Sequence, residues 1–119
     1  MAERLLSHQS AAHKQLVADI RELAAWLRLY VYSPYDSRRS PAGWPDLTII
    51  GIHVAYREVK TGRGRPTPEQ TDVMRRLQDA GADVAVWRDT DWRMGTIQRE
   101  LYQLAARAPE LGDGRGTAR

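Results

Sequence analysis

The stretch DLTIIGIHVAYREVK, residues 46–60, decides the fold of this protein. Residues 46–50 and 54–60 are rich in β-branched and aromatic side chains, which favour β-strands. Gly51-Ile52-His53 between them is typical of a turn. The stretch therefore predicts a β-hairpin.

The hairpin also predicts which side chains meet. Side chains alternate between the two faces of a sheet, so Glu58 and Lys60 are expected on one face and Val59 on the other, toward the core. Folding the hairpin about residue 52 places Asp46 opposite Glu58, to within one register step. Two carboxylates and an ammonium group are thus expected to converge.

The flanking sequence predicts the remaining elements. Apolar residues recur at helical spacing from Leu16 to Leu27, in a helix that starts as early as residue 2. Thr67-Pro68-Glu69-Gln70 has the form of a capping box with proline at the first helical position, and Gly81 is placed to end that helix. The expected elements are a helix ending near residue 27, strands over 29–32, 46–50, 54–60 and 83–87, and helices over 67–80 and 94–106.

The order α-β-β-β-α-β-α predicts an α/β fold in which helices flank a mixed β-sheet. A length of 119 residues with 42% hydrophobic residues suits one domain over residues 1–110, and residues 111–119 are expected to form a flexible tail. Because the chain has no Cys, a disulfide framework and thiolate metal sites are excluded. No apolar stretch approaches the roughly 20 residues that span a bilayer, so an intracellular protein without membrane contact is expected.

Basic residues gather around the hairpin. The chain has 16 Arg and 2 Lys, against 15 acidic residues. Arg suits phosphate oxygens because its planar guanidinium donates as a fork. Residues 38–65 contain few acidic residues, which predicts an anion-attracting surface. Its members are Arg38, Arg39, Arg57, Lys60, Arg63 and Arg65. Four of these are expected to contact nucleic-acid phosphates, or else to be ordinary solvated side chains: Arg38, Arg39, Arg63 and Arg65.

The carboxylates of the hairpin suit a metal ion. Asp46 and Glu58 offer the hard oxygen ligands that Mg²⁺ binds, and the Val59 carbonyl is a candidate third ligand. A metal ion held there lowers the pKa of a bound water and neutralises charge on a phosphate, while Lys60 would orient the attacking water. The alternative interpretation is a cross-strand salt bridge on a solvated face of an ordinary structural or protein-binding domain.

Several motifs follow one another within residues 13–93: Gly43-x-Pro45-Asp46-Leu47, Glu58-Val59-Lys60, Gln70, Gly81 and Val86-Trp87-Arg88. In this order they resemble the VRR-NUC branch of the PD-(D/E)xK nuclease superfamily. The resemblance implies a restriction-endonuclease-like core, dependence on Mg²⁺ or Mn²⁺, and cutting of branched DNA in the manner of Holliday-junction resolvases. Small members of this branch occur in phages and bacteria, which implies the cytoplasm of a bacterial or phage-infected cell.

The same resemblance assigns roles to residues. It implies that Asp46 and Glu58 are metal ligands, that Lys60 is the catalytic lysine, and that Gln70 is a glutamine near the active site. From the local sequence alone, Gln70 is also the residue that closes the capping box. The two roles are compatible.

The chain departs from the family on the first helix. The family usually has a Glu there, about 30 residues before the Asp, where this chain has His13, with Asp19 and Glu22 further along. His13 and Glu22 are candidate replacements. Asp19 and Glu22 share a helical face, and the alternative is that both are surface charges.

The leading hypothesis is a metal-dependent, structure-selective DNA endonuclease that hydrolyses phosphodiester bonds at four-way (Holliday) junctions. No base-reading helix or finger is recognisable, which favours structure over sequence as the target. Paired cuts by a chain with one site require a homodimer, through the first helix, strand 29–32 or the last helix. The alternative is a DNA-binding module that has lost catalysis. Trp44 and Trp87 are expected to pack, and Trp44 has a second interpretation as a wedge at a branch point.

Overall fold

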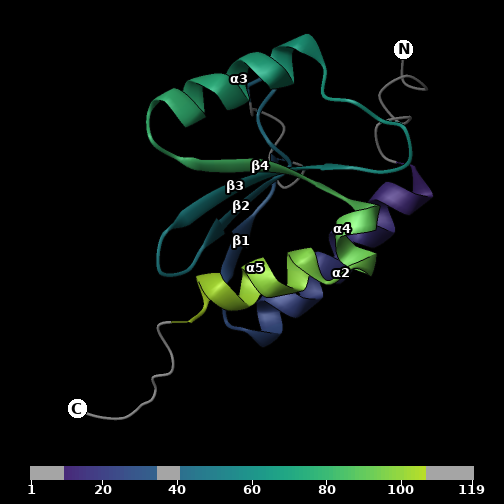
Figure 1. Cartoon of the computed structure of the whole chain (residues 1–119), viewed down its shortest axis with the longest axis vertical. Coiled ribbons are helices and arrows are strands. Elements are labelled where there is room, and N and C mark those ends of the chain that lie inside the picture. Colours follow the sequence, from purple (N-terminus) through teal and green to yellow (C-terminus); the bar gives the residue numbers. More distant parts are fainter. Residues whose placement is uncertain (1–9, 35–40, 107–119) are drawn as a thin grey trace.

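The computed structural model of the chain describes residues 10–34 and 41–106. Its elements are α2 (Ala11–Trp26), β1 (Tyr30–Tyr32), β2 (Leu47–Ile50), β3 (Val54–Lys60), α3 (Pro68–Asp79), β4 (Asp83–Arg88), α4 (Asp89–Arg93) and α5 (Thr96–Leu104). The strands form one sheet, with α3 on one side and α2, α4 and α5 on the other (Figure 1). The predicted α/β fold with a mixed, helix-flanked sheet is confirmed. The predicted tail, residues 111–119, lies outside the described residues.

The strand order in the sheet is β1-β2-β3-β4. The first three strands are antiparallel neighbours, and β4 runs parallel to β3. Parallel neighbours need a crossover connection, which α3 supplies here. The strand β1 lies at an edge of the sheet.

The hairpin register agrees with the prediction. Leu47 pairs with Arg57 and Ile50 pairs with Val54. Extended by one residue, the same register puts Asp46 opposite Glu58. The convergence of the two carboxylates therefore follows from a turn centred on residue 52.

The hydrophobic core lies between the sheet and the α2 and α5 helices. Leu16, Ile20 and Ala24 recur every four residues, and this spacing directs one face of α2 onto the sheet. The sheet contributes the odd-numbered residues of β2 and β3, and α5 covers them with its own apolar face. These core residues are Leu47, Ile49, Ala55, Val59, Trp87, Ile97, Leu101 and Leu104.

The helix predicted over residues 94–106 is confirmed as α5, to within two residues at each end. The sequence did not predict the short helix α4, which begins directly where β4 ends. Asp91 Oδ2 accepts from the Arg88 backbone N–H at 2.8 Å and caps this short helix. Gly95 then adopts a left-handed φ of 83° and separates α4 from α5.

Residues next to the helix ends in the sequence determine where α2 begins and where α3 ends. The helix α2 starts at Ala11, where the Ser10 side chain caps it by accepting from the His13 backbone N–H at 3.2 Å. The predicted earlier part, from residue 2, falls on residues that the structure does not describe. The helix α3 ends at Asp79, and Gly81 follows with a φ of 90°, as predicted for a helix terminator. Over the described ranges, none of the helices combines the length and the apolar character needed to cross a membrane.

Candidate active site

The Asp46 carboxylate lies where β2 begins, beside the end of β3. Its side chain is buried, and Oδ2 accepts a hydrogen bond from the Val59 backbone N–H at 2.9 Å. Because Val59 lies between Glu58 and Lys60, this hydrogen bond joins the Asp46 carboxylate to the Glu58-Val59-Lys60 segment. The two ends of the hairpin meet as the sequence predicted.

His13 is the residue of the first helix that reaches this carboxylate. It lies in the first turn of α2 and is 7% exposed. Its Nε2 donates to Asp46 Oδ2 at 3.2 Å and to the Val59 carbonyl oxygen at 3.1 Å. The carbonyl can only accept, so Nε2 carries the proton. Of the candidate replacements for the helical Glu, His13 is the one that the fold brings to the predicted ligands.

The surroundings favour the protonated form of His13. The hydrogen bond to the Asp46 carboxylate raises the pKa of His13 above its ordinary value, against burial, which lowers the pKa. The charge of Asp46, the Val59 carbonyl and the charge of Glu58 add to the rise. The imidazole is thus a proton-bearing group inside a cluster of oxygen atoms.

Glu58 and Lys60 lie on the same face of β3, as predicted. Lys60 Nζ is 3.1 Å from Glu58 Oε2, and Glu58 is only 1% exposed. Burial raises the pKa of Glu58 to about 7; the charge of Asp46 adds to the rise, and the Lys60 ammonium opposes it. Within the described part of the chain, Glu58 Oε1 is buried without a hydrogen-bond partner. Such an oxygen costs free energy, and a cation bound to it would remove that cost.

These donors fit a divalent cation. Carboxylate oxygens of Asp46 and Glu58 and the carbonyl oxygen of Val59 are the ligand types that Mg²⁺ and Mn²⁺ prefer. Over residues 10–34 and 41–106, no three His, Asp or Glu side chains form a group already arranged to hold a metal ion. The main-chain oxygen of Val59 is therefore the candidate third oxygen ligand, and the imidazole of His13 is the candidate nitrogen ligand.

Arg88 is a cation at this site that the sequence interpretation missed. In the parallel pairing of β3 with β4, Lys60 lies beside Arg88, and residues paired in this way project from the same face of the sheet. The Arg88 side chain is half-buried. Its position at the end of β4 was visible in the sequence, but its neighbour depends on the parallel register.

Gln70 closes the predicted capping box. The Thr67 backbone N–H donates to Gln70 Oε1 at 2.8 Å, and the Gln70 backbone N–H donates to Thr67 Oγ1 at 3.1 Å. This start of α3 rests on Gly43, where a Cβ would come within 2.6 Å of the Glu69 carbonyl oxygen. Gln70 therefore lies next to the loop that leads into Asp46.

Of the four arginines expected to contact phosphates, the structure describes two. Arg63 and Arg65 follow Lys60 directly, and both side chains are exposed, as contact with a phosphate requires. Arg38 and Arg39 lie outside the described residues. The basic surface beside the candidate site therefore includes Arg63 and Arg65 among the described residues.

Arg57 does not belong to that surface, and this part of the prediction is wrong. The alternation along β3 turns Arg57 toward the core, where it is 4% exposed. Its guanidinium pairs with Asp83 at 3.0 Å and Glu100 at 3.1 Å and lies 5.1 Å from the ring centre of Trp87. Trp87 itself is buried, as expected of a packing residue.

Asp83 connects Arg57 to an exposed histidine. His53 Nε2 lies 2.8 Å from Asp83 Oδ2. Burial raises the pKa of Asp83, but the hydrogen bond from His53 and the charge of Arg57 outweigh it, so the pKa lies below its ordinary value. This cluster stabilises the core side of the sheet and lies on the face of β3 opposite to Glu58.

Glu22 lies apart from the candidate site. It is about 14 Å beyond His13 along the α2 axis at 1.5 Å per residue. It is exposed and, with Asp19, lines a different cavity beside Trp26 and Trp92. The arrangement favours the interpretation of Asp19 and Glu22 as surface charges.

Comparisons of the chain with protein-family models, with curated proteins and with solved structures found no match.

Proposed function

We propose that this protein is a metal-dependent DNA endonuclease that hydrolyses phosphodiester bonds, with branched DNA such as four-way junctions as its target and the cytoplasm as its location. One observation carries the proposal. His13, Asp46, Glu58 and Lys60 converge at one end of the sheet, where the buried Glu58 Oε1 has no hydrogen-bond partner among the described residues. Clusters with a strongly raised carboxyl pKa are more common at functional sites than elsewhere.

The ligands of an Mg²⁺ or Mn²⁺ ion would be Asp46, Glu58 and the Val59 carbonyl, with His13 as a nitrogen ligand. When bound, the ion would supply a water of lowered pKa and charge neutralisation at the phosphate. The hydrogen bond from the Val59 N–H holds the Asp46 carboxylate in place for this role. The imidazole of His13 would have to give up its Nε2 proton to become a ligand, since metal-bound nitrogen must be unprotonated.

Lys60 has the charge and the position to act on the scissile phosphate. Glu58 holds its ammonium at 3.1 Å, and the side chain is 13% exposed, so the group is fixed yet reaches the surface. We assign to Lys60 the orientation of the attacking water and the stabilisation of negative charge on the phosphoryl oxygens. Arg88 adds a second cation beside it, and Arg63 and Arg65 contact neighbouring phosphates.

The choice of branched DNA rests on what the described residues offer for recognition. Contacts between these cations and phosphates carry no sequence information. Over residues 10–34 and 41–106, no helix or finger of a base-reading type is recognisable, so the shape of the DNA is the remaining target. Paired cuts at a four-way junction also require two sites, which implies a C2 homodimer.

One observation favours a second candidate, a DNA-binding module that has lost catalysis. The Nε2 proton of His13 already bridges Asp46 Oδ2 and the Val59 carbonyl, two of the oxygens assigned to the metal. A histidine that keeps this proton would hold the site closed to a cation. DNA binding without cleavage in any divalent metal would then be observed.

The test is a cleavage assay on an end-labelled four-way junction, a fork and a linear duplex, each with Mg²⁺, Mn²⁺ or EDTA. Asp46→Asn removes the charge of the buried carboxylate, and Asp79→Asn removes an exposed one at the end of α3 as the matched control. The proposal expects metal-dependent cutting by wild type and by Asp79→Asn, and none by Asp46→Asn. Tight DNA binding without cutting in either metal would replace the proposal by the second candidate.

A further inference from the structure

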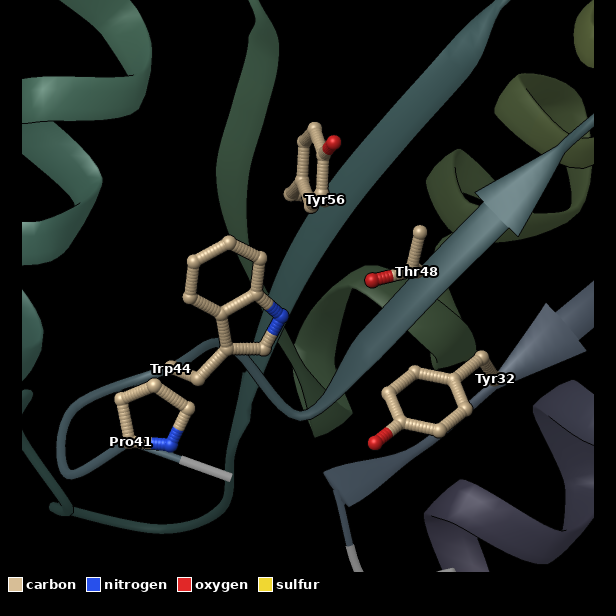
Figure 2. A pocket seen from close by; sticks show the side chains of 5 residues that line it. All are labelled: Tyr32, Pro41, Trp44, Thr48 and Tyr56. Atoms are coloured by element: carbon tan, nitrogen blue, oxygen red, sulfur yellow. The ribbon is translucent and has the colours of Figure 1, made fainter. Parts of the chain in front are cut away.

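A pocket of about 340 Å³ lies beside the candidate active site. Its lining comes from β1, β2, β3 and the loop before β2, and Figure 2 shows the side chains surrounding a common space. Tyr32 pairs with Thr48, and Thr48 pairs with Tyr56, so these three project from the same face of the sheet. The lining residues are Tyr32, Pro41, Trp44, Thr48 and Tyr56.

The chemistry of the pocket suits a flat, neutral ring. Three aromatic rings and a proline line it, and among the described residues no charged side chain does. Trp44 and Tyr56 meet edge to face, with ring centres 5.8 Å apart and an interplanar angle of 90°. Figure 2 shows the indole nitrogen of Trp44 and the hydroxyl of Thr48 directed into the space between the rings. A phosphate would find no cation among these described lining residues, whereas a nucleobase would find ring faces for stacking and polar atoms for its edge.

Two of the lining residues lie close to the candidate active site along the chain. Tyr56 precedes Glu58 by two residues on the same face of β3, which is about 7 Å along a strand. Trp44 precedes Asp46 by two residues and is separated from it only by the buried Pro45. A DNA strand whose phosphodiester lay at the carboxylates would therefore bring a neighbouring base to the pocket.

We propose that this pocket binds an unpaired base of the DNA strand next to the phosphodiester that is cut. The inference rests on the proposed nuclease function and narrows its substrate class. A base inside a duplex is stacked on both sides and cannot enter such a pocket without leaving the stack. Branched DNA that carries an unpaired strand, such as a fork or a flap, is thus the substrate, in preference to a fully paired four-way junction.

The test measures equilibrium binding in EDTA, where no metal supports cutting, by fluorescence anisotropy of a labelled single strand, a forked duplex and a blunt duplex. Wild type is compared with Trp44→Ala and with Trp26→Ala, which removes an indole that is 80% exposed on α2. We expect Trp44→Ala to weaken binding of the single strand and the fork about 5- to 100-fold and to leave blunt-duplex binding unchanged. Trp26→Ala should bind all three as wild type does.

A second measurement requires no change in the protein. Single bases are removed from the unpaired arm of the fork, one position at a time, and binding to wild type is measured again. One abasic position should weaken binding as much as Trp44→Ala does, and the same position should have no further effect in Trp44→Ala.

The outcomes separate this inference from the proposed function. If wild type binds and cuts DNA but treats paired and unpaired strands alike, or if no abasic position matters, the base pocket is wrong and the nuclease stands. If wild type neither binds nor cuts any of the DNA substrates, both are wrong.

Discussion

The imidazole of His13 lies 3.2 Å from the carboxylate of Asp46, although 33 residues separate them in the chain. The same nitrogen lies 3.1 Å from the Val59 carbonyl. The first turn of α2 is thereby fixed against the start of β2 and the end of β3. The helix α2 thus places the His13 imidazole, a side chain of a metal-ligating type, beside the carboxylates of the hairpin.

The first prediction concerns this contact. His13→Ala removes a buried donor from two acceptors, so the metal-free protein should lose about 1–3 kcal/mol of unfolding free energy, measured by urea denaturation. If His13 is also a ligand, the affinity for Mn²⁺ should fall at least about tenfold. Mutation of residues that only hold a metal ligand in place already lowers metal affinity by about this factor. Isothermal titration with Mn²⁺ measures this. Unchanged Mn²⁺ affinity in a folded His13→Ala variant would remove His13 from the ligand set.

Glu58 gives the second prediction, a pH dependence in the metal-free protein. Its pKa rises from 4.5 to about 7 on folding, so the native state binds more protons than the unfolded chain between these values. Stability should therefore fall as pH rises through this window, by about 3 kcal/mol at 1.36 kcal/mol per pH unit. Glu58→Gln should lack this decline.

Unfolding free energies measured in EDTA at several pH values between 4 and 8 test this second prediction. Addition of Mn²⁺ above pH 7 should raise the unfolding free energy of wild type toward that of Glu58→Gln. The reason is that an ion that binds only the native state stabilises that state. Parallel pH curves for the two proteins would show that Glu58 is not held in the buried, raised-pKa state.

Gly43 provides a third prediction, about the loop that positions Asp46. Gly43 has a φ of 86°, and a Cβ there would lie 2.6 Å from the Glu69 carbonyl oxygen. Gly95 has a φ of 83° with nothing within 4 Å of its Cβ position, so Gly95→Ala is the matched control. Both variants should lose about 1 kcal/mol from the left-handed backbone, and Gly43→Ala should lose clearly more from the clash. Equal melting temperatures for the two variants would mean that the α3 contact has no energetic role.

The fourth prediction concerns salt. If Arg63 and Arg65 contact phosphates, Arg63→Ser/Arg65→Ser should weaken DNA binding equally for all sequences, and the slope of log K against log salt should fall by about 0.9 for each lost contact. Arg93→Ser/Arg99→Ser removes the same charge from α4 and α5, across the sheet, and should leave the slope nearly unchanged. Equal slopes in the two double variants would indicate a general charge effect without local contacts.

Much of this arrangement could be predicted from local sequence. The hairpin register follows from the turn around residue 52, and the alternation along β3 separates Glu58 and Lys60 from Val59. The start of α3 follows from Thr67, Pro68 and Gln70, because capping depends on neighbouring residues alone.

The remaining features depend on contacts that local sequence does not encode. His13 reaches Asp46 only because α2 packs at one angle on the sheet. Arg88 joins Lys60 only through the parallel register of β4, which the α3 crossover sets. The neighbours of Arg57 in the chain predict a basic surface, whereas the alternation of side chains along β3 places Arg57 in the core. The aromatic pocket combines segments whose proximity appears only in the folded sheet.

The most direct test of the central claim is the single-turnover rate of DNA cleavage by Lys60→Ala, beside Lys14→Ala, which changes the only other lysine in the chain. The reaction is started by adding Mn²⁺ to preformed complexes of each protein with the DNA that wild type cuts best, and binding is measured separately in EDTA. The account predicts that Lys60→Ala binds this DNA but cuts it at least about 100-fold more slowly, while Lys14→Ala cuts as wild type does. Cleavage by Lys60→Ala at the rate of Lys14→Ala would contradict it.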